Sequence, residues 1–436
     1  MSGRRATGNV STEFPRIAAI AQQDQKVRFT SLAHLLNKEY LLASLDKLNR
    51  NAAAGVDGES VRAYKKQATE RIAELHERLR KGLYRAQPVR RVYIPKANGE
   101  RRPLGIPNVE DRIVQRAVGG IIEAIYEPYF VDSSYGFRRN RSCHDALERL
   151  RQIVHKERTQ YIVEVDIKGY FDRINHQWLN RFLGHRIADR SILRIVNKWL
   201  RAGIMEQGIR TRSESGTPQG GPISPLLANI YLHYVLDLWL EIKYKRSVVG
   251  TCEMVRYADD FVVCFERYEE AERFLKALRQ RLAEFHLELS EEKTRIIEIG
   301  KKSAENGKTG PTEQNRTFDF LGFTHYMRMK GKQGYRLARK PSKKSRNRFL
   351  MKIQSWLEKY RDRNVWWQGY QLKKKLQGYY QYFGLRYCGP ALKHIKWHVE
   401  RLWIMALRKR SQKHRLYWSG IGRMRWFSLL PNPTMR

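Results

Sequence analysis

The stretch Arg256-Tyr257-Ala258-Asp259-Asp260-Phe261-Val262-Val263 places two adjacent carboxylates between short apolar runs. Met254-Val255 precedes the pair, and the run from Phe261 to Phe265 follows it without a charged residue. Short β-rich runs around a polar break predict a tight hairpin with the acids at its tip. Adjacent carboxylates repel each other, so a fold that keeps both charged usually offsets them with a cation, often a divalent metal. A solvated turn explains an Asp-Asp pair equally well, so the pair alone identifies no site.

A second candidate strand carrying an acid runs from Tyr161 to Ile167 and contains Asp166. If this strand pairs with the hairpin, parallel or antiparallel, Asp166 comes to lie beside Asp259. Three carboxylates from neighbouring strand ends can hold two Mg²⁺ ions, the arrangement used for in-line phosphoryl transfer. Asp166, Asp259 and Asp260 are therefore the predicted metal ligands and catalytic residues.

Three motifs follow one another along the chain: Val165-Asp166 with Phe171 after it, Gly216-Thr217-Pro218-Gln219-Gly220-Gly221, and Tyr257-Ala258-Asp259-Asp260. Together they resemble the palm motifs of reverse transcriptases, specifically the bacterial group II intron-encoded reverse transcriptases and maturases of the compact, endonuclease-lacking type. The resemblance extends over nearly the whole chain from about residue 32. It implies a right-hand polymerase of α/β (α+β) class. Fingers and a palm with an antiparallel sheet backed by helices are followed by an all-α thumb and maturase region.

Four consecutive regions are expected from the resemblance and from shifts in composition. They are an N-terminal extension with the start of the fingers (1–90), the fingers (91–160), the catalytic palm (161–335), and a helical thumb or maturase region with a basic RNA- and DNA-binding end (336–436). Residues 1 to about 28 show little periodicity, which predicts a loose arm. A helix is predicted from Val109 to Tyr126.

A cationic hairpin is predicted in the fingers. The segment from Tyr93 to Pro107 reads as two strands joined by an Asn-Gly turn, with Lys96 and Arg102 flanking it on neighbouring strands. Two cations converging there could meet one anion, such as a triphosphate. By their spacing alone, Lys96 and Arg102 are simply two of the 84 Lys and Arg residues of the chain. The resemblance to the family assigns both to nucleotide binding.

Three further nucleotide contacts are implied by the resemblance. Phe171 would be the aromatic gate beneath the incoming sugar, where its bulk excludes a 2′-hydroxyl and selects deoxynucleotides. As a bare aromatic, Phe171 is more often part of a core. Gln219 would face the sugar and base of the nucleotide, and Lys293 would approach the active site.

Arginines and aromatics are interleaved in the segment from Ser134 to Ser142, where they can grip phosphates and stack on bases. Capping of the next helix by Ser142 and Asp145 is a compatible reading. In the family that the chain resembles, this region contacts the template strand, and a later Leu-Gly hairpin holds the primer end. The predicted template and primer contacts are Arg138, Arg139, Arg141 and Gly322.

The most apolar segment, Pro222 to Leu240, is interrupted by Asn229, His233 and Asp237. His233 and Asp237, four apart on a predicted helix, are expected to be a surface or half-buried pair without a catalytic role. No segment approaches the roughly 18 uninterrupted apolar residues of a membrane-spanning helix. The first residues lack the apolar core of a signal peptide. The four cysteines show no C-x-x-C spacing, so neither a zinc module nor a disulfide framework is indicated.

The charge balance points to a polyanionic partner. The chain has 84 Lys and Arg against 44 Asp and Glu, a net charge of +40. Residues 341–436 hold 23 of these cations, only 3 acids, and seven of the ten tryptophans. A helical bundle with a basic face fits duplex and structured RNA. Most of these tryptophans are expected to be core residues of that bundle.

The resulting prediction is an RNA-directed DNA polymerase of a group II intron, using two Mg²⁺ ions. It would also act as a maturase that promotes splicing, and would copy the intron by target-primed reverse transcription during retromobility. Its partners would be intron RNA, an RNA template with a DNA primer or target DNA, and dNTPs, with no membrane. We expect it in the bacterial cytoplasm, at the nucleoid when bound to target DNA. Two alternatives stay open: a splicing cofactor with an inert palm, and a defence-associated or CRISPR-linked reverse transcriptase.

Overall fold

The computed structural model describes residues 10–95, 101–156, 158–206, 209–211, 216, 220–299, 316–329, 335–410 and 427–435. The chain divides into two compact units. Unit 1 comprises Met1–Leu150 and Val163–Ile296, and unit 2 comprises Arg151–Ile162 and Ile297–Arg436. In this division by contacts the strands between residues 317 and 341 belong with the helices that follow them. The predicted region boundaries, including the end of the palm at 335, stay predictions.

The elements up to residue 298 alternate between helices and short strands. The helices are α1 (Val10–Gln23), α2 (Lys38–Asp46), α3 (Val61–Tyr64), α4 (Ala68–Arg80), α5 (Val109–Tyr126), α6 (Cys143–Lys156), α7 (Tyr170–Arg173), α8 (His176–Arg186), α9 (Arg190–Leu200), α10 (Ser224–Leu232) and α11 (Tyr268–Glu284). The strands are β1 (Val89–Pro95), β2 (Arg101–Ile106), β3 (Tyr161–Asp166), β4 (Ile204–Glu206), β5 (Ile209–Thr211), β6 (Cys252–Tyr257), β7 (Asp260–Phe265) and β8 (Arg295–Glu298).

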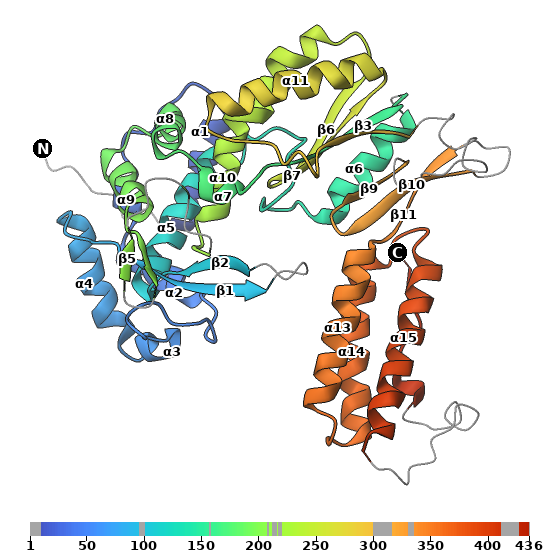
Figure 1. Ribbon diagram of the computed structural model, residues 1–436. Coiled ribbons are helices and arrows are strands. Elements are labelled where there is room, and N and C mark those ends of the chain that lie inside the picture. The colour runs from blue at the N-terminus through green and yellow to red at the C-terminus, as the bar shows by residue number, and fades with distance from the viewer. Residues whose placement is uncertain are drawn as a thin grey trace, which may run out of the picture. The chain divides into compact units, whose positions relative to one another are not determined.

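The sheet that carries the predicted acids has the strand order β6-β7-β3-β8. Strands β6 and β7 form the predicted antiparallel hairpin, and β7 is the neighbour of β3, so the predicted pairing of the two acid-bearing segments is confirmed. The residues of β7 from Phe261 to Phe265 are all fully buried. Helix α11 covers the hairpin on one side (Figure 1). Burial on both faces explains why this strand is continuously apolar rather than alternating.

A second sheet in unit 1 has the order β2-β1-β4-β5. Strands β1 and β2 form the predicted hairpin, with Ile94 opposite Arg102, and β1 pairs in parallel with β4. Helix α5 has the predicted bounds, and most of its residues are buried, including Val109 and Tyr126. It is the central packing helix for the N-terminal segments.

The expectation of a loose N-terminal arm is wrong for residues 10–23, which form helix α1 packed on α5. Ile17 and Ala21, four residues apart, are buried. The ring of Phe14 contacts that of Tyr40 edge-on at 5.2 Å between centroids. Pro15 lies inside this helix, and a proline within a helical pattern argues against a helix when only the sequence is read.

Unit 2 combines a small sheet with a helical bundle. The sheet has the order β11-β10-β9, from β9 (Thr317–Phe320), β10 (Phe323–Met329) and β11 (Tyr335–Pro341). Helices α13 (Lys343–Lys359), α14 (Val365–Phe383) and α15 (Gly389–Arg408) lie side by side (Figure 1). No helix in the described ranges is long and apolar enough to cross a membrane.

The tryptophans of the bundle do not follow the expected pattern. Trp403 is fully buried, and its Nε1 donates to Gln368 Oε1 at 2.9 Å. Trp366, Trp367 and Trp397 are instead 49, 39 and 43% exposed. The prediction that most bundle tryptophans are core residues is therefore wrong for these three. Exposed aromatics on a cationic unit are typical of surfaces on which nucleic-acid bases stack.

Candidate active site

The two predicted acids lie at the turn of the β6–β7 hairpin. Tyr257 pairs with Asp260, so the turn itself consists of Ala258 and Asp259. Ala258 has φ 58°, a left-handed conformation that side-chain-bearing residues adopt at a cost of about 1–2 kcal/mol. Asp259 is half-buried and Asp260 is exposed. The surrounding contacts must hold this turn in place, since its backbone is not in a relaxed conformation.

Gly136 packs directly against this turn. A Cβ at Gly136 would lie 2.3 Å from the backbone nitrogen of Ala258, which excludes any larger residue. The segment around Gly136 also bonds to β6: Tyr135 N donates to Arg256 O, and Arg256 N donates to Ser133 O, both at 2.8 Å. The segment therefore serves as a short additional pairing partner at the edge of the β6–β7 hairpin.

Arg256 holds the turn from inside. Its guanidinium is fully buried, and all five of its N–H donors are used. It donates to Asp237 Oδ1 (2.7 Å), Asp237 Oδ2 (2.5 Å), Asn229 Oδ1 (3.0 Å), Ser134 Oγ (2.8 Å) and Ala258 O (3.0 Å). The bond to the Ala258 carbonyl connects this network to the turn that carries Asp259. A fully satisfied buried network of this kind fixes a single geometry.

The expected surface position of His233 and Asp237 is wrong, because both are fully buried. After α10 the helix continues through two wider π turns, His233–Asp237 and Trp239–Lys243, which bring Asp237 to Arg256. Burial alone would raise the pKa of Asp237, but the charge of Arg256 and its two hydrogen bonds hold that pKa below its usual value. Asp237 is therefore an ionised structural partner beneath the active site.

The third predicted acid, Asp166, ends β3 on the strand next to β7. Its backbone carbonyl accepts a hydrogen bond from Ser290 N at 2.8 Å, which draws the segment after α11 alongside the strand end. Lys293, in the turn that follows, places its Nζ 3.0 Å from Asp166 Oδ2. Lys293 thus lies next to Asp166, which is a predicted metal ligand, as its predicted approach to the active site requires.

Phe171 lies in the short helix α7, a few residues beyond Asp166, and is half-buried. Its ring packs against that of Tyr170 at 5.4 Å. The buried Tyr170 hydroxyl donates to Ala228 O, and its pKa is raised well above the usual value, first by burial and in part by the charge of Asp259. Phe171 therefore packs beside a buried tyrosine near the turn of Asp259, and its role as the gate stays a prediction.

Part of the predicted nucleotide site lies outside the described residues. This holds for Lys96, for Gln219 and for the side chain of Arg102. The backbone of Arg102 is described and pairs with Ile94 in the β1–β2 hairpin. Their nucleotide-binding roles stay predictions.

The three arginines predicted to contact the template differ in exposure. Arg138 is buried, and its guanidinium donates to Glu127 Oε1 (3.0 Å) and to the carbonyls of Val131 (2.7 Å) and Ser134 (2.8 Å). These internal bonds make Arg138 a structural residue, so it is not presented to a template. The predicted alternative, a helix cap by Ser142 and Asp145, is present.

Arg139 remains accessible, since it pairs with Glu123 at 2.8 Å with its side chain 67% exposed. Exposed ion pairs of this kind are worth about 0–1 kcal/mol, so a phosphate can replace the carboxylate at little cost. Arg141 is half-buried and donates both to the carboxylate of Asp132 at 2.6 Å and to its backbone carbonyl at 2.7 Å. Their template contacts stay predictions.

Gly322 occupies a two-residue turn between β9 and β10 together with Leu321, because Phe320 pairs with Phe323. Leu321 and Gly322 have φ 51° and 79°, as a type I′ hairpin turn requires. The Gly322 carbonyl accepts from Ser342 N at 2.9 Å, which ties this turn to the start of α13. The predicted primer contact thus lies on a firmly held hairpin.

The predicted metal ligands match magnesium in kind, since carboxylate oxygens are the protein ligands it prefers. Among the described residues, no group of three or more His, Cys, Asp or Glu side chains is placed to hold a metal ion. The Lys293 ammonium against Asp166 shows that this carboxylate already attracts a cation. The hairpin turn with Asp259 and Asp260 and the strand end with Asp166 belong to one sheet and supply donors of the right kind, and their joint binding of a metal stays a prediction.

The sequence analysis missed Arg256, Asn229 and Ser134 as supports of the site. A signal was available, because the three polar interruptions of the apolar segment are spaced four residues apart. That spacing puts Asn229, His233 and Asp237 on one face of a helix. It therefore predicts one buried polar stripe that needs hydrogen-bond partners, rather than three unrelated polar residues in an apolar segment.

Comparison with known proteins adds a family match. Residues 94–325, more than half of the 436-residue chain, match the family model described as reverse transcriptase (RNA-dependent DNA polymerase). The matched stretch contains Asp166, Phe171 and the Asp259-Asp260 pair.

Curated relatives agree with that match. The chain is 40% identical to group II intron-encoded protein LtrA of Lactococcus lactis subsp. cremoris over 232 residues. This match covers 53% of this chain and 38% of the relative. Over 283 residues it is 33% identical to protein YkfC of Escherichia coli (strain K12), covering 57% of this chain and 74% of the relative. A match of 28% identity over 153 residues, covering 34% of this chain and 21% of the relative, is to nuclear intron maturase 3, mitochondrial, of Arabidopsis thaliana. The chain spans less than half of the length of LtrA.

Proposed function

The chain belongs to the reverse transcriptase family and is a relative of the group II intron-encoded proteins, and from this premise we propose that it is an RNA-directed DNA polymerase. It would extend a DNA primer along an RNA template with deoxynucleoside triphosphates. The observation that carries the proposal is the strained turn of Ala258 and Asp259, held by Arg256 on a hairpin whose neighbouring strand ends at Asp166.

In the proposed reaction, the 3′-hydroxyl of the primer attacks the α-phosphorus of the nucleotide. A phosphodiester bond forms, the bond to pyrophosphate breaks, and the hydroxyl proton is released. Asp166, Asp259 and Asp260 would hold two Mg²⁺ ions. Bound magnesium supplies a lowered pKa at the attacking hydroxyl and a counter-charge for the phosphoryl oxygens.

The protein groups around the acids have separate tasks in this proposal. The Arg256 network keeps the Asp259 carboxylate at a fixed position, so that little reorganisation is needed during the reaction. Phe171 restricts the space beneath the sugar. Lys293 exchanges its contact with Asp166 for the negative charge of the nucleotide.

We further propose that the protein binds intron RNA as a maturase and copies the intron at a target-primed site. Support comes from the names of the relatives, which include a group II intron-encoded protein and an intron maturase. The net charge of residues 341–436 and the exposed Trp366, Trp367 and Trp397 supply a surface for structured RNA. We also propose that the protein works in the bacterial cytoplasm, at the nucleoid when it acts on target DNA; the bacterial origin of two relatives supports this.

Primer extension tests the polymerase proposal. The full chain is incubated with an RNA template, an annealed DNA primer, Mg²⁺ and either deoxynucleotides or ribonucleotides. We expect extension with deoxynucleotides only, and its loss in the Asp259→Ala/Asp260→Ala variant. A folded, RNA-binding wild type that extends no primer would contradict the proposal and leave a splicing cofactor with an inert palm.

A further inference from the structure

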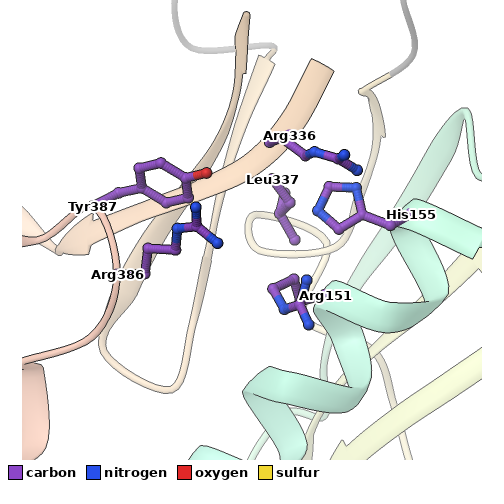
Figure 2. A pocket seen from close by; sticks show the side chains of 6 residues that line it. All are labelled: Arg151, His155, Arg336, Leu337, Arg386 and Tyr387. Atoms are coloured by element: carbon purple, nitrogen blue, oxygen red, sulfur yellow. The ribbon is translucent and has the colours of Figure 1, made fainter. Parts of the chain in front are cut away.

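A cationic pocket lies within unit 2 and involves none of the predicted site residues. Its volume is about 210 Å³, and its lining consists of three arginines, one histidine, one tyrosine and one leucine: Arg151, His155, Arg336, Leu337, Arg386 and Tyr387. Figure 2 shows these side chains facing one another across the pocket. The lining contains no carboxylate. We refer to it as the Arg336 pocket.

Three parts of the chain build the Arg336 pocket. Arg151 and His155 are four residues apart on the last turns of α6, which places them on one face of that helix. Arg336 comes from β11, and Arg386 with Tyr387 from the loop between α14 and α15. Arg336 and Arg386 converge from two separate segments, and an anion between them would offset the repulsion of their charges.

The loop that supplies Arg386 and Tyr387 is firmly held. Cys388 N donates to Leu385 O at 3.0 Å, and Cys388 Sγ donates to Arg339 O on β11 at 3.4 Å. Tyr387 has φ 74°, a conformation that a non-glycine residue keeps only where its surroundings enforce it. The pocket wall is therefore preformed.

Two of the arginines that line the pocket, Arg336 and Arg386, contact aromatic rings or solvent rather than carboxylates of the described residues. Arg386 stacks on the Tyr387 ring, with Cζ 5.3 Å from the ring centroid, and Arg328 approaches the same ring at 5.9 Å. Within the described ranges, neither Arg336 nor Arg386 forms an ion pair. Guanidinium groups present planar pairs of donors that match the oxygens of a phosphate.

We propose that the Arg336 pocket binds one backbone phosphate of a nucleic-acid strand. A phosphate in a chain fits better than a free anion because the unit around it is cationic throughout, with 23 Lys and Arg against 3 acids in residues 341–436. Exposed tryptophans on the same unit can stack on bases of the same strand.

The position of this phosphate along the nucleic-acid strand can be derived from the geometry of β11. The derivation rests on the proposed function, which puts the primer end at Gly322. β11 pairs with β10 from Pro341, beside the Gly322 turn, to Tyr335, next to Arg336. Five residues separate Pro341 from Arg336, or about 17 Å of antiparallel strand. Successive phosphates of one strand advance about 3.4 Å along a duplex axis. With the primer end at Gly322, the pocket would meet a phosphate roughly five nucleotides back.

Binding of an RNA–DNA hybrid tests the proposal without any incorporation of nucleotides. The affinity of the full chain for the hybrid is measured by fluorescence anisotropy over a range of salt concentrations. Arg336→Gln/Arg386→Gln is compared with Lys359→Gln/Arg361→Gln, which removes the same charge from exposed positions of unit 2. We expect the pocket variant to bind at least about tenfold more weakly than this control. Arg336→Lys/Arg386→Lys should recover the salt dependence but only part of the affinity.

A second series replaces single phosphates of either strand by uncharged methylphosphonates. One position should weaken wild-type binding and leave the pocket variant unaffected. The proposal is wrong if the pocket variant binds like its control, or if its methylphosphonate profile matches that of the wild type. The proposal would also be overturned if the pocket variant lost the wild type's binding of inorganic pyrophosphate but kept its hybrid affinity. The pocket would then hold a free anion. An inactive polymerase that still shows the expected profile would refute the proposed function alone.

Discussion

Arg256 and Asp237 form a two-point ion pair with both side chains fully buried, at 2.7 Å for Nε–Oδ1 and 2.5 Å for Nη2–Oδ2. The same guanidinium donates to the carbonyl of Ala258, the residue next to Asp259. This buried ion pair therefore helps to fix the turn that carries a predicted catalytic carboxylate. Such a pair is not retained for stability alone, since apolar residues of similar volume often stabilise a core equally well.

The first prediction separates stability from positioning. Asp237→Asn leaves the Arg256 charge buried without its counter-ion and should cost about 3–5 kcal/mol in free energy of unfolding, measured with urea. Arg256→Met/Asp237→Leu removes both charges and should lose much less stability. Primer extension should stay low in that double variant, because the Ala258 carbonyl has lost its donor. Full extension by the double variant would show that the pair is only structural.

The second prediction concerns Lys293, whose ammonium lies 3.0 Å from Asp166 Oδ2. Lys293→Met removes a cation that competes with magnesium for this carboxylate, so half-maximal extension should need less Mg²⁺. Both side chains are largely exposed, so the change should stay below about fivefold. The KM for dNTP should rise, because a cation near the nucleotide is lost. Lys276→Met, on the exposed face of α11, is the matched control and should change neither value.

The third prediction tests the proposed gate. Phe171→Ala should raise ribonucleotide use relative to deoxynucleotide use by about 10–100-fold in kcat/KM, because space opens beneath the sugar. Phe137→Ala removes an aromatic ring that is 57% exposed and should leave this ratio unchanged. An unaltered ratio in the Phe171 variant would mean that this ring belongs to the core and selects nothing.

The fourth prediction is a pH dependence in unit 2. His325 is fully buried against Phe318, and burial, with a smaller contribution from the Arg339 charge, lowers its pKa to about 3. The unfolded chain, with a histidine pKa near 6.5, therefore binds a proton that the folded chain does not. The stability contributed by neutral His325 is complete above about pH 6.5 and is lost as pH falls toward 3, by roughly 1 kcal/mol per pH unit.

Urea unfolding followed by tryptophan fluorescence between pH 7 and pH 5 measures this slope. His325→Phe should flatten it, because no proton is taken up at that position on unfolding. His34→Gln, at an exposed position, should keep the slope of the wild type. Equal slopes in all three proteins would exclude His325 as the source.

Local sequence patterns predicted the parts of the fold that depend on local periodicity. Helix α5 has the predicted bounds because its apolar positions repeat around a long helix. The β6–β7 hairpin and its neighbour β3 follow from short apolar strands with acids at their ends. Asp166, Asp259 and Asp260 could be assigned to one sheet because they mark a strand end and a tight turn. These features leave little freedom in how the strands align with each other.

The supports of the site could not be predicted in the same way. The donors and acceptors around Arg256 come from Ser134, Asn229, Asp237 and Ala258, which are far apart in sequence. Only the folded chain shows that Arg138, in a segment rich in exposed arginines, is buried in bonds to its own loop. Long-range pairing of charges is a property of tertiary packing, which periodicity does not encode.

Single-nucleotide incorporation under Mg²⁺ titration tests the central claim most directly. The wild type is compared with Asp259→Asn and Asp260→Asn, which keep the side-chain shape and remove one negative charge each. We predict incorporation of a complementary deoxynucleotide opposite an RNA template by the wild type. In both variants the rate should fall by about 10³-fold or more at every Mg²⁺ concentration, with hybrid affinity unchanged. Incorporation at the wild-type rate by either variant would contradict the assignment of the β6–β7 turn as the catalytic centre.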